Sequence, residues 1–232
     1  MTQIYLIRHG QASFGTANYD QLSDKGQAQA HALGRYLKNL LQTKPYIVTG
    51  SMQRHQQTAQ LALAEFAVEM PMFNSKLWNE FNHHEVLTAY EPKLADVEFL
   101  GQQLAQCSEP REYLKTIFYP AMQQWSEHNN HGEYQETWLQ FKARVQQALY
   151  ELCSQIQRHQ PKEVLVFSSG GVISVVVAHL LGLSAERTFA LNWEIANTSV
   201  TMLKWQNEQL NLHSFNEYHY LKDNQADLTT WL

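Results

Sequence analysis

The chain has 232 residues, of which 44% are hydrophobic and 12% aromatic, enough to bury a full core without metals or disulfides. Asp and Glu outnumber Lys and Arg by 22 to 17, giving a formal net charge of −5. A mildly acidic chain without a basic run argues against nucleic acid as a partner and against adsorption to a membrane surface. Two cysteines, Cys107 and Cys153, are too few for a disulfide framework and favour a reducing, cytoplasmic compartment.

Two apolar stretches need to be weighed as targeting or membrane segments. Near the N-terminus only the four consecutive apolar residues 4–7 precede Arg8, too few for the core of a signal peptide. The stretch 164–183 is interrupted by serines and glycines at 168–171 and by His179, which favours a buried strand, a tight loop and a helix over a membrane span. We therefore expect a cytoplasmic protein with no membrane partner.

The first third of the chain alternates strand and helix signals. The apolar run 4–7 predicts a buried strand, and Ser23 is a good N-cap for a helix with leucines at helical spacing. Residues 46–48 predict a second strand that stops at Gly50, after which Ser51 can cap a helix that runs through Leu63. This order predicts a mostly parallel sheet with helices on both faces.

The middle of the chain, approximately residues 81–134, shows helical signals but few strands. We expect it to be a helical insertion in a single domain that spans residues 1–232. Thr137 and Gln140 have the form of a capping box at the start of an amphipathic helix. Residues 164–167 predict a strand, 171–181 a helix, and 199–205 with 210–215 a pair of antiparallel strands. The predicted fold is a three-layer α/β domain with a mixed, mostly parallel sheet.

Residues that can do chemistry follow three of the predicted strands. The first strand leads into Arg8-His9-Gly10, the second into Arg54, and the third into Ser168-Ser169-Gly170-Gly171 at the start of a helix. Because ligands of open α/β sheets bind beyond the carboxyl ends of the strands, we expect these groups to converge at one edge. Guanidinium groups and free helix amides are what a phosphate dianion requires. The residues alone therefore predict an anion site.

Several short motifs extend this pattern over most of the chain. Residues 6–11 read L-I-R-H-G-Q, residues 22–30 have the form L-S-x-x-G-x-x-Q-A, and residues 51–59 have the form S-x-x-R-x-x-Q-T-A. Together with Asn79-Glu80-Phe81, the run 164–172 and Asn197-Thr198-Ser199, they resemble the motifs of the histidine phosphatase (phosphoglycerate mutase-like) superfamily. R-H-G alone is a weak signal, whereas R-H-G and the second arginine motif at this spacing are a specific one.

The resemblance implies both a reaction and the residues that perform it. His9 would be the nucleophile that forms a phosphohistidine, and Arg8 and Arg54 would clamp the phosphoryl oxygens. Glu80 would be the general acid that protonates the leaving alkoxide. The substrate, a small phosphorylated molecule or inorganic phosphate, would also be contacted by Gly10, Gln11, Gly170 and His83. The family needs no metal or other cofactor, and we expect none here.

One residue of the candidate site departs from the family's pattern. Family members usually carry a second histidine in S-H-G-G, where this chain has Ser169. A hydroxyl can donate one hydrogen bond to a phosphoryl oxygen but cannot carry the charge of an imidazolium, and losing one donor at such a site lowers the rate by about 10²–10³. We therefore expect a phosphomonoester hydrolase that works through a phosphohistidine at His9 and is weakened by Ser169. A non-catalytic phosphate-binding protein, a mutase-like phosphotransferase and a homodimer stay open.

Other residues suggest alternatives. His83-His84-Glu85 could bring an imidazole into the pocket, but adjacent histidines point in different directions and surface histidines often have no role. His128 and His131 have no cysteine or carboxylate partner at metal-ligand spacing. A serine hydrolase is disfavoured because Phe167 stands where the G-x-S-x-G motif of those enzymes needs a glycine.

Overall fold

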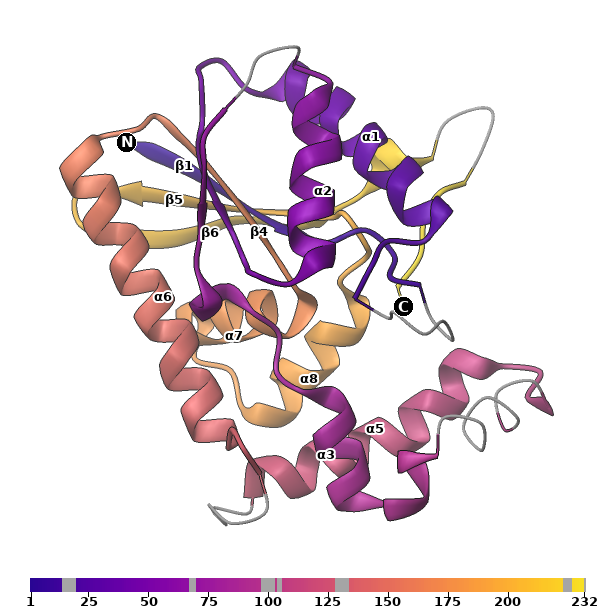
Figure 1. Cartoon of the computed structure of the whole chain (residues 1–232). Helices are drawn as coiled ribbons and strands as arrows, with labels where there is room; N and C mark the ends of the chain where they lie inside the picture. The colour runs from indigo at the N-terminus through magenta and orange to yellow at the C-terminus, as the bar shows by residue number, and fades with distance from the viewer. Residues whose placement is uncertain are drawn as a thin grey trace.

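The computed structural model describes residues 1–13, 20–66, 70–96, 103, 106–127, 134–222 and 227–231. Its strands are β1 (Thr2–Arg8), β2 (Tyr46–Thr49), β3 (Met72–Asn74), β4 (Glu163–Ser168), β5 (Val200–Gln206) and β6 (Gln209–Glu217). Its helices are α1 (Asp24–Leu40), α2 (Gln53–Ala64), α3 (His83–Tyr90), α5 (Pro110–Glu127), α6 (Trp138–His159), α7 (Gly170–Leu181) and α8 (Ala185–Glu194). Short 3₁₀ helices are η1 (Lys76–Trp78), η2 (Pro92–Ala95) and η3 (His219–Leu221). Figure 1 shows their arrangement.

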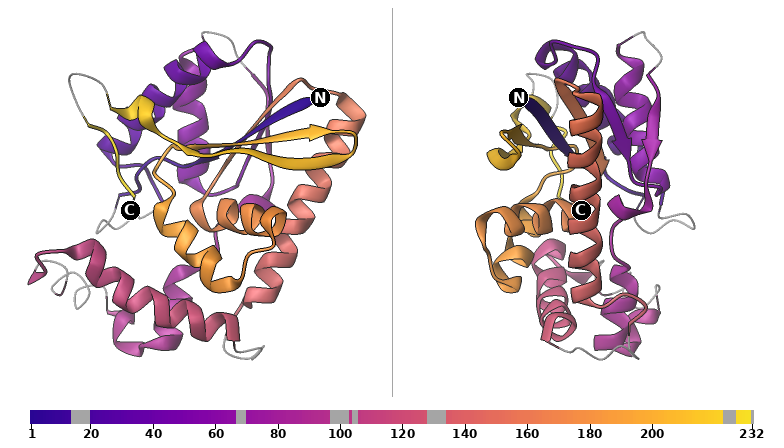
Figure 2. Two further views of the ribbon diagram at one scale, coloured as in Figure 1. Left: turned by 180° about the vertical axis from the view of Figure 1, so that it is seen from behind. Right: turned by 90° about the vertical axis from the view of Figure 1, so that its left-hand side faces the viewer.

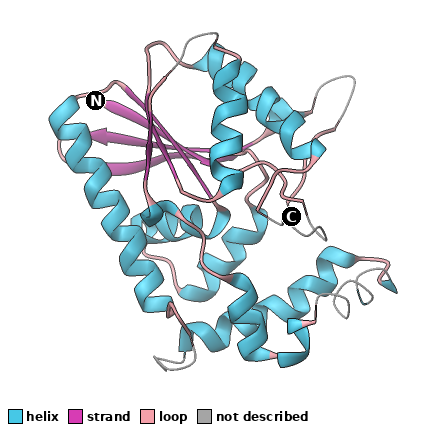
Figure 3. Cartoon of the chain, viewed as in Figure 1, coloured by secondary structure: helices cyan, strands magenta, loops and turns pink. Residues whose placement is uncertain are grey.

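The strands form one mixed sheet in the order β3-β2-β4-β1-β5-β6. β1, β2, β3 and β4 run parallel, β5 is antiparallel to β1, and β6 is antiparallel to β5. Helices lie on both faces of this sheet, as Figure 3 shows. The predicted three-layer α/β fold with a mixed, mostly parallel sheet is therefore confirmed.

Each face of the sheet has its own hydrophobic core. On β1, Ile4 and Leu6 belong to the core that contains buried residues of α6 and α7, whereas Tyr5 and Ile7 belong to the core under α1 and α2. Successive side chains of a strand point to opposite faces. A central strand covered on both sides is therefore apolar throughout, which explains the uninterrupted run that predicted β1.

Three features differ from the sequence-based expectations. β3 and α8 were not predicted. β3 has three residues, all exposed, so it carries no hydrophobic pattern from which a strand could be inferred. The expected cap of α2 is wrong: Met52 is its N-cap, with no side-chain cap bond. Ser51 instead exchanges hydrogen bonds with Asn79, which ties the start of α2 to the turn after η1.

The segment expected as a helical insertion contains α3, η2 and α5 among its described residues. Residues 97–102, 104–105 and 128–133 of that segment lie outside the described part. Figure 2 shows α3 and α5 side by side at one end of the molecule, and α5 also contacts α8. Within the described ranges, no helix combines the length and apolar character that a membrane crossing would require.

Candidate active site

Three parallel strands end side by side and place the candidate site at their carboxyl edge. The backbone N–H of His9, after β1, donates to Ser168 O at 2.9 Å, and that of Gly50, after β2, donates to Phe167 O at 2.9 Å. Both strand ends are thereby bonded to the end of β4. The start of α2 and the start of α7 follow directly, so the topology brings the predicted anion-binding residues together.

His9 is held as a neutral imidazole. Its side chain is buried, and its Nδ1 lies 2.7 Å from the carbonyl oxygen of Gly10. On the other side of the ring, Arg54 Nε donates to Nε2 of His9 at 3.2 Å. A ring that faces an acceptor with Nδ1 and a donor with Nε2 carries its single proton on Nδ1. The lone pair of Nε2 therefore points into the arginine-lined site, as a nucleophile requires.

The electrostatic surroundings of His9 favour the same protonation state. Burial is the main cause that holds the pKa of His9 well below its usual range, and the positive charges of Arg54 and Arg8 lower that pKa further. The backbone of His9 is also fixed, because Asn197 Nδ2 and the Thr198 N–H both donate to its carbonyl oxygen at 3.2 Å. The imidazole is thus neutral and oriented before any substrate binds.

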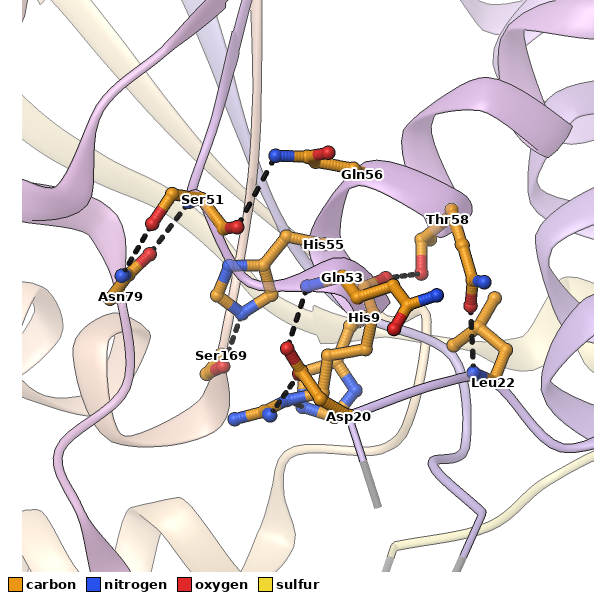
Figure 4. Close-up of polar contacts among 12 residues, drawn as sticks. His9, Asp20, Leu22, Ser51, Gln53, His55, Gln56, Thr58, Asn79 and Ser169 are labelled. Atoms are coloured by element: carbon orange, nitrogen blue, oxygen red, sulfur yellow. Dashed lines mark hydrogen bonds and ion pairs between the residues drawn. The ribbon is translucent and has the colours of Figure 1, made fainter. Parts of the chain in front are cut away.

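Arg54 is oriented by two partners. It lies in the first turn of α2 and is only 5% exposed. Besides the bond from Nε to His9, its Nη1 donates to Asp20 Oδ1 at 2.6 Å. The second oxygen of that carboxylate accepts from the N–H of Gln53 at 2.8 Å, as Figure 4 shows. The Asp20 carboxylate therefore holds the guanidinium plane in the orientation that aims Nε at His9.

Arg8 lies beside the start of α7. Its Nη1 donates to the carbonyl oxygens of Ile195 and Trp231. A Cβ added at Gly170 would lie 3.6 Å from Arg8 Nε, so the guanidinium passes close to the first turn of that helix. The Arg8 charge lowers the pKa of both His9 and Glu80, which shows that it acts on the same group of residues.

Glu80 reaches α7 from the turn after η1. Its Oε2 accepts from the N–H of Gly171 at 2.9 Å and its Oε1 from the N–H of Phe81 at 3.1 Å. A Cβ at Gly171 would lie 2.2 Å from Oε1, so this position must be glycine if the carboxyl is to fit. Burial raises the pKa of Glu80 above its usual value, although both N–H groups and the two arginines lower it. A carboxyl with a raised pKa keeps its proton to a higher pH than an exposed one does, which suits general acid catalysis.

Ser169 does not have the contacts that its position at a helix start would predict. It is the N-cap of α7 and fully buried, but its side chain makes no cap bond. Its Oγ lies instead 2.6 Å from Nε2 of His55, the residue after Arg54. The ring centroids of His55 and His9 are 5.6 Å apart. Figure 4 shows the His55 imidazole directed from α2 towards Ser169.

The two glycines predicted to contact substrate lie where the backbone comes close to other groups. The N–H of Gly10 donates to Thr58 Oγ1 at 3.0 Å, and a Cβ at Gly10 would lie 2.5 Å from Gly26 O. A Cβ at Gly170 would lie 2.4 Å from Asn192 Oδ1. Gly10 therefore needs to be glycine for packing, because its neighbour is backbone, whereas at Gly170 a larger residue would have to displace the end of the Asn192 side chain.

The other two residues that were predicted to contact substrate are Gln11 and His83, and their surroundings differ from each other. Gln11 turns its side chain to Ser23, whose Oγ donates to Gln11 Oε1 at 3.0 Å, and so lies against the start of α1. His83 opens α3, and burial, Arg54 and His84 lower its pKa to about 4. The His83 ring lies 6.5 Å from that of Phe118 in α5, whereas His84 is exposed.

Sequence comparison identifies the family. A profile of the histidine phosphatase superfamily (branch 1) matches residues 4–218. The chain belongs to this superfamily. Among curated proteins, none matches the sequence of this superfamily member significantly.

Solved structures of phosphatases and mutases have the same fold as this superfamily member. A phosphoglycerate mutase from Bacillus anthracis has a TM-score of 0.64 at 19% identity, covering 95% of each chain. The α-ribazole phosphatase of Shigella flexneri has a TM-score of 0.63 at 20% identity, over 93% of this chain and 96% of its own. A phosphoserine phosphatase of Entamoeba histolytica, solved with phosphoserine, has a TM-score of 0.63 at 17% identity, over 96% of this chain and all of its own. At these identities the likeness shows the fold alone.

Two side chains of this histidine phosphatase superfamily site were not predicted from the sequence. Asp20 and His55 contact Arg54 and Ser169, which lie 34 and 114 positions away in the chain. His55 lies in the second arginine motif at a position marked x, so the motif gave it no role. A buried arginine needs a counter-ion, but nothing in the sequence identifies which carboxylate supplies it. Among the described residues, no three His, Cys, Asp or Glu side chains cluster as a metal site.

Proposed function

We propose that this histidine phosphatase superfamily member hydrolyses phosphomonoesters of small molecules through a phosphohistidine at His9. The observation that carries the proposal is the contact between Arg54 Nε and His9 Nε2 at 3.2 Å, with the other ring nitrogen at the Gly10 carbonyl. This arrangement combines an unprotonated nucleophile with a cation at the place where a phosphoryl group would become attached.

In the first step, Nε2 of His9 attacks phosphorus as the P–O bond to the alcohol breaks. The Arg54 Nε–H, released from Nε2, donates to a phosphoryl oxygen, and the charge of Arg8 adds to the stabilisation of the transition state. Glu80 gives its proton to the leaving alkoxide, so the alcohol departs neutral and the carboxylate is left behind. The raised pKa of Glu80 supports its role as the donor.

In the second step, the phosphohistidine is hydrolysed by water. The Glu80 carboxylate takes a proton from the water as its oxygen attacks phosphorus and the N–P bond breaks. Inorganic phosphate leaves, His9 returns to its neutral state, and Glu80 is again protonated. If an alcohol took the place of water, the same residues would transfer the phosphoryl group, which is the mutase-like alternative.

The test is steady-state hydrolysis of p-nitrophenyl phosphate, combined with rapid acid or alkaline quenching of ³²P-labelled substrate. We expect turnover and a label on His9 that is stable to alkali and lost in acid. His9→Ala should lower kcat by about 10³-fold or more and abolish the label, because the nucleophile is removed.

The matched control is His213→Ala, which removes an exposed imidazole of β6 and should leave both readouts unchanged. A label that survives in His9→Ala would contradict the proposal, as would full activity of that variant.

The second candidate function is phosphate binding without turnover, and Ser169 is the observation that favours it. Such a protein would bind inorganic phosphate, form no phosphohistidine, and lose affinity mainly in Arg54→Ala, because the arginine supplies the anion contact. Calorimetric titration with phosphate, beside the labelling experiment, separates the two candidates.

A further inference from the structure

His55 is a buried imidazole to which the mechanism above gives no role. It is fully buried and lies one residue after Arg54, and its Nε2 lies 2.6 Å from Ser169 Oγ. Among the described residues, nothing hydrogen-bonds its Nδ1. Burying an imidazole with one unsatisfied nitrogen is unfavourable, so its contact with Ser169 needs a reason other than stability.

The packing around His55 indicates which ring nitrogen carries the proton. A Cβ added at Gly50 would lie only 2.1 Å from Nδ1, and in glycine a Cα hydrogen takes that direction. The Gly50 backbone therefore packs against this edge of the ring, and a hydrogen on Nδ1 would have no acceptor among the described residues. Burial, followed by the charge of Arg54, holds the pKa of His55 well below its usual range, so the ring is neutral. The proton therefore lies on Nε2, which donates to Ser169 Oγ.

This assignment leaves the Ser169 hydroxyl with its own proton to donate. Serine at an N-cap normally accepts from the first amides of its helix, but Ser169 makes no such bond in α7. Its Oγ makes no second hydrogen bond within the described ranges. The adjacent residue, Gly170, comes close to the Arg8 guanidinium, and the His55 ring lies 5.6 Å from that of His9. An anion held by these residues would supply the missing acceptor.

We propose that the Ser169–His55 pair replaces the second histidine of the site: His55 Nε2–H donates to Ser169 Oγ, and the Ser169 hydroxyl donates to a phosphoryl oxygen. The imidazole is supplied by the first turn of α2 instead of the start of α7, and it acts through the Ser169 hydroxyl. Ser169 is then the residue that touches substrate, and His55 is a positioning residue. The inference rests on the proposed function, since it assigns further residues to that same site.

The first test compares His55→Ala, His55→Gln and Ser169→Ala in the hydrolysis of p-nitrophenyl phosphate. A glutamine amide can donate to Ser169 Oγ from near the position of Nε2, whereas alanine cannot. We expect Ser169→Ala and His55→Ala each to lower kcat by about 10- to 10³-fold. The double variant should be no less active than the less active of the two single variants. His55→Gln should retain most of the activity. Equal loss in His55→Gln and His55→Ala would overturn the proposal.

The second test exchanges the two side chains. Ser169→His alone drives a second imidazole against the His55 ring, because Oγ already lies at 2.6 Å from Nε2, and should lower kcat further. His55→Ala/Ser169→His removes that clash, puts the imidazole at the start of α7 and should recover kcat to within about 10-fold of the unchanged protein. If Ser169→His alone is fully active, or if the double variant is inactive while its circular dichroism and thermal unfolding are unchanged, the proposal fails.

Binding of inorganic vanadate separates this proposal from the proposed function. The pair should donate to a bound anion even without turnover, so Ser169→Ala and His55→Ala should each weaken vanadate binding in calorimetry and His55→Gln should not. If the protein does not turn over substrate but shows this binding pattern, the Ser169–His55 pair is supported and the phosphatase proposal is contradicted. If it turns over substrate, and His55→Ala leaves vanadate affinity and kcat unchanged, the phosphatase proposal is supported and the pair is contradicted.

The same contact could be taken for a nucleophilic serine activated by a histidine base. In that case Nε2 would accept the Ser169 proton, and Nδ1 would be the ring nitrogen that carries hydrogen. The ³²P label would then lie on Ser169, stable to acid and lost in alkali, and His55→Gln would be as inactive as His55→Ala. Either result overturns the proposal.

Discussion

At the scale of single residues, the pKa values of two groups of the site are shifted in opposite directions. Burial is the main cause of both shifts: it lowers the pKa of His9 and raises that of Glu80. Each group therefore favours its uncharged form, because burial penalises the charged one. The two arginines reinforce the shift of the His9 pKa and oppose that of the Glu80 pKa, which is raised only because burial outweighs them.

These shifts predict the pH dependence of hydrolysis. Glu80 acts in its protonated form, so activity is present below its raised pKa and lost as pH rises through it. His9 acts in its neutral form, so activity is present above its lowered pKa and lost as pH falls through it. We expect the pH profile of kcat/KM for an alkyl phosphate to fall on the alkaline side. In Glu80→Gln that limb should disappear and the rate should drop by about 10²–10⁴.

The leaving group supplies the control for this prediction. p-Nitrophenolate leaves without a proton, so Glu80→Gln should lower kcat/KM for p-nitrophenyl phosphate far less than kcat/KM for an alkyl phosphate. An alkaline limb that persists for the alkyl phosphate in Glu80→Gln would assign it to another group.

The sequence predicted most candidate residues because motifs fix their spacing. His9, Arg54 and Glu80 were expected near one another, and the structure brings them together. His55 was not expected, because its partner lies on another strand-to-helix turn 114 residues away. No sequence pattern around a single histidine on a helix indicates a contact over that separation. Gln11 illustrates the opposite case: its backbone follows the R-H-G motif, but its side chain turns to the N-cap of α1.

At the scale of secondary-structure elements, α6 holds the turn that carries Glu80. Arg144 of α6 donates through Nη1 to the carbonyl oxygens of Leu77 at 2.9 Å and Asn79 at 2.8 Å. Its Nε and Nη2 bind the two oxygens of Glu136 at 2.6 and 2.8 Å. A guanidinium that binds a carboxylate with one side and two carbonyls with the other fixes both partners. The helix therefore positions Glu80 without touching the reacting groups.

Replacing Arg144 should consequently separate acid catalysis from nucleophilic attack. We expect Arg144→Ala to lower kcat/KM for an alkyl phosphate by about 10-fold or more, with a much smaller loss of kcat/KM for p-nitrophenyl phosphate, because only the protonation of the leaving group is impaired in the first step. It should also destabilise the fold by about 1 kcal/mol, since partly buried acceptors lose their donor.

Steady-state kinetics with both substrates and denaturant unfolding check the Arg144 prediction. Arg35→Ala is the control, because Arg35 is exposed on α1 and its ion pair with Glu65 is long, at 3.8 Å. Equal losses for the two substrates would show that Arg144 supports the whole site rather than the Glu80 turn.

The elements themselves differ in how well the sequence predicts them. β1 and β4 are buried on both faces, so their apolar runs are conspicuous, and the capping box of α6 is present as predicted. β3 forms by pairing with the edge of β2 and exposes all three of its residues. Such a strand is stabilised by its neighbour's backbone rather than by its own side chains, so its sequence carries little signal.

At the scale of the whole molecule, the site makes stability depend on pH. His9 and His55 are buried with pKa values well below the usual range. In mild acid the folded protein therefore binds fewer protons than the unfolded chain does. For a lowered histidine pKa, the stabilisation is present above the unfolded pKa, near 6.5, and is lost as pH falls towards the folded value. Each such residue contributes a slope of about 1.4 kcal/mol per pH unit within that window.

His55→Gln tests this linkage, because glutamine preserves the bond to Ser169 but does not titrate. Below about pH 6, we expect the free energy of unfolding of the unchanged protein to fall more steeply than that of the variant, the difference approaching about 1.4 kcal/mol per pH unit. The pKa of Glu80 is shifted in the opposite direction and that of His83 in the same direction. Both residues are present in both proteins, so their contributions cancel in the difference between the two slopes. Urea unfolding between pH 5 and 7.5 measures the slopes, with exposed His213→Ala as the control. Identical slopes in His55→Gln and the unchanged protein would mean that His55 titrates normally in the folded state.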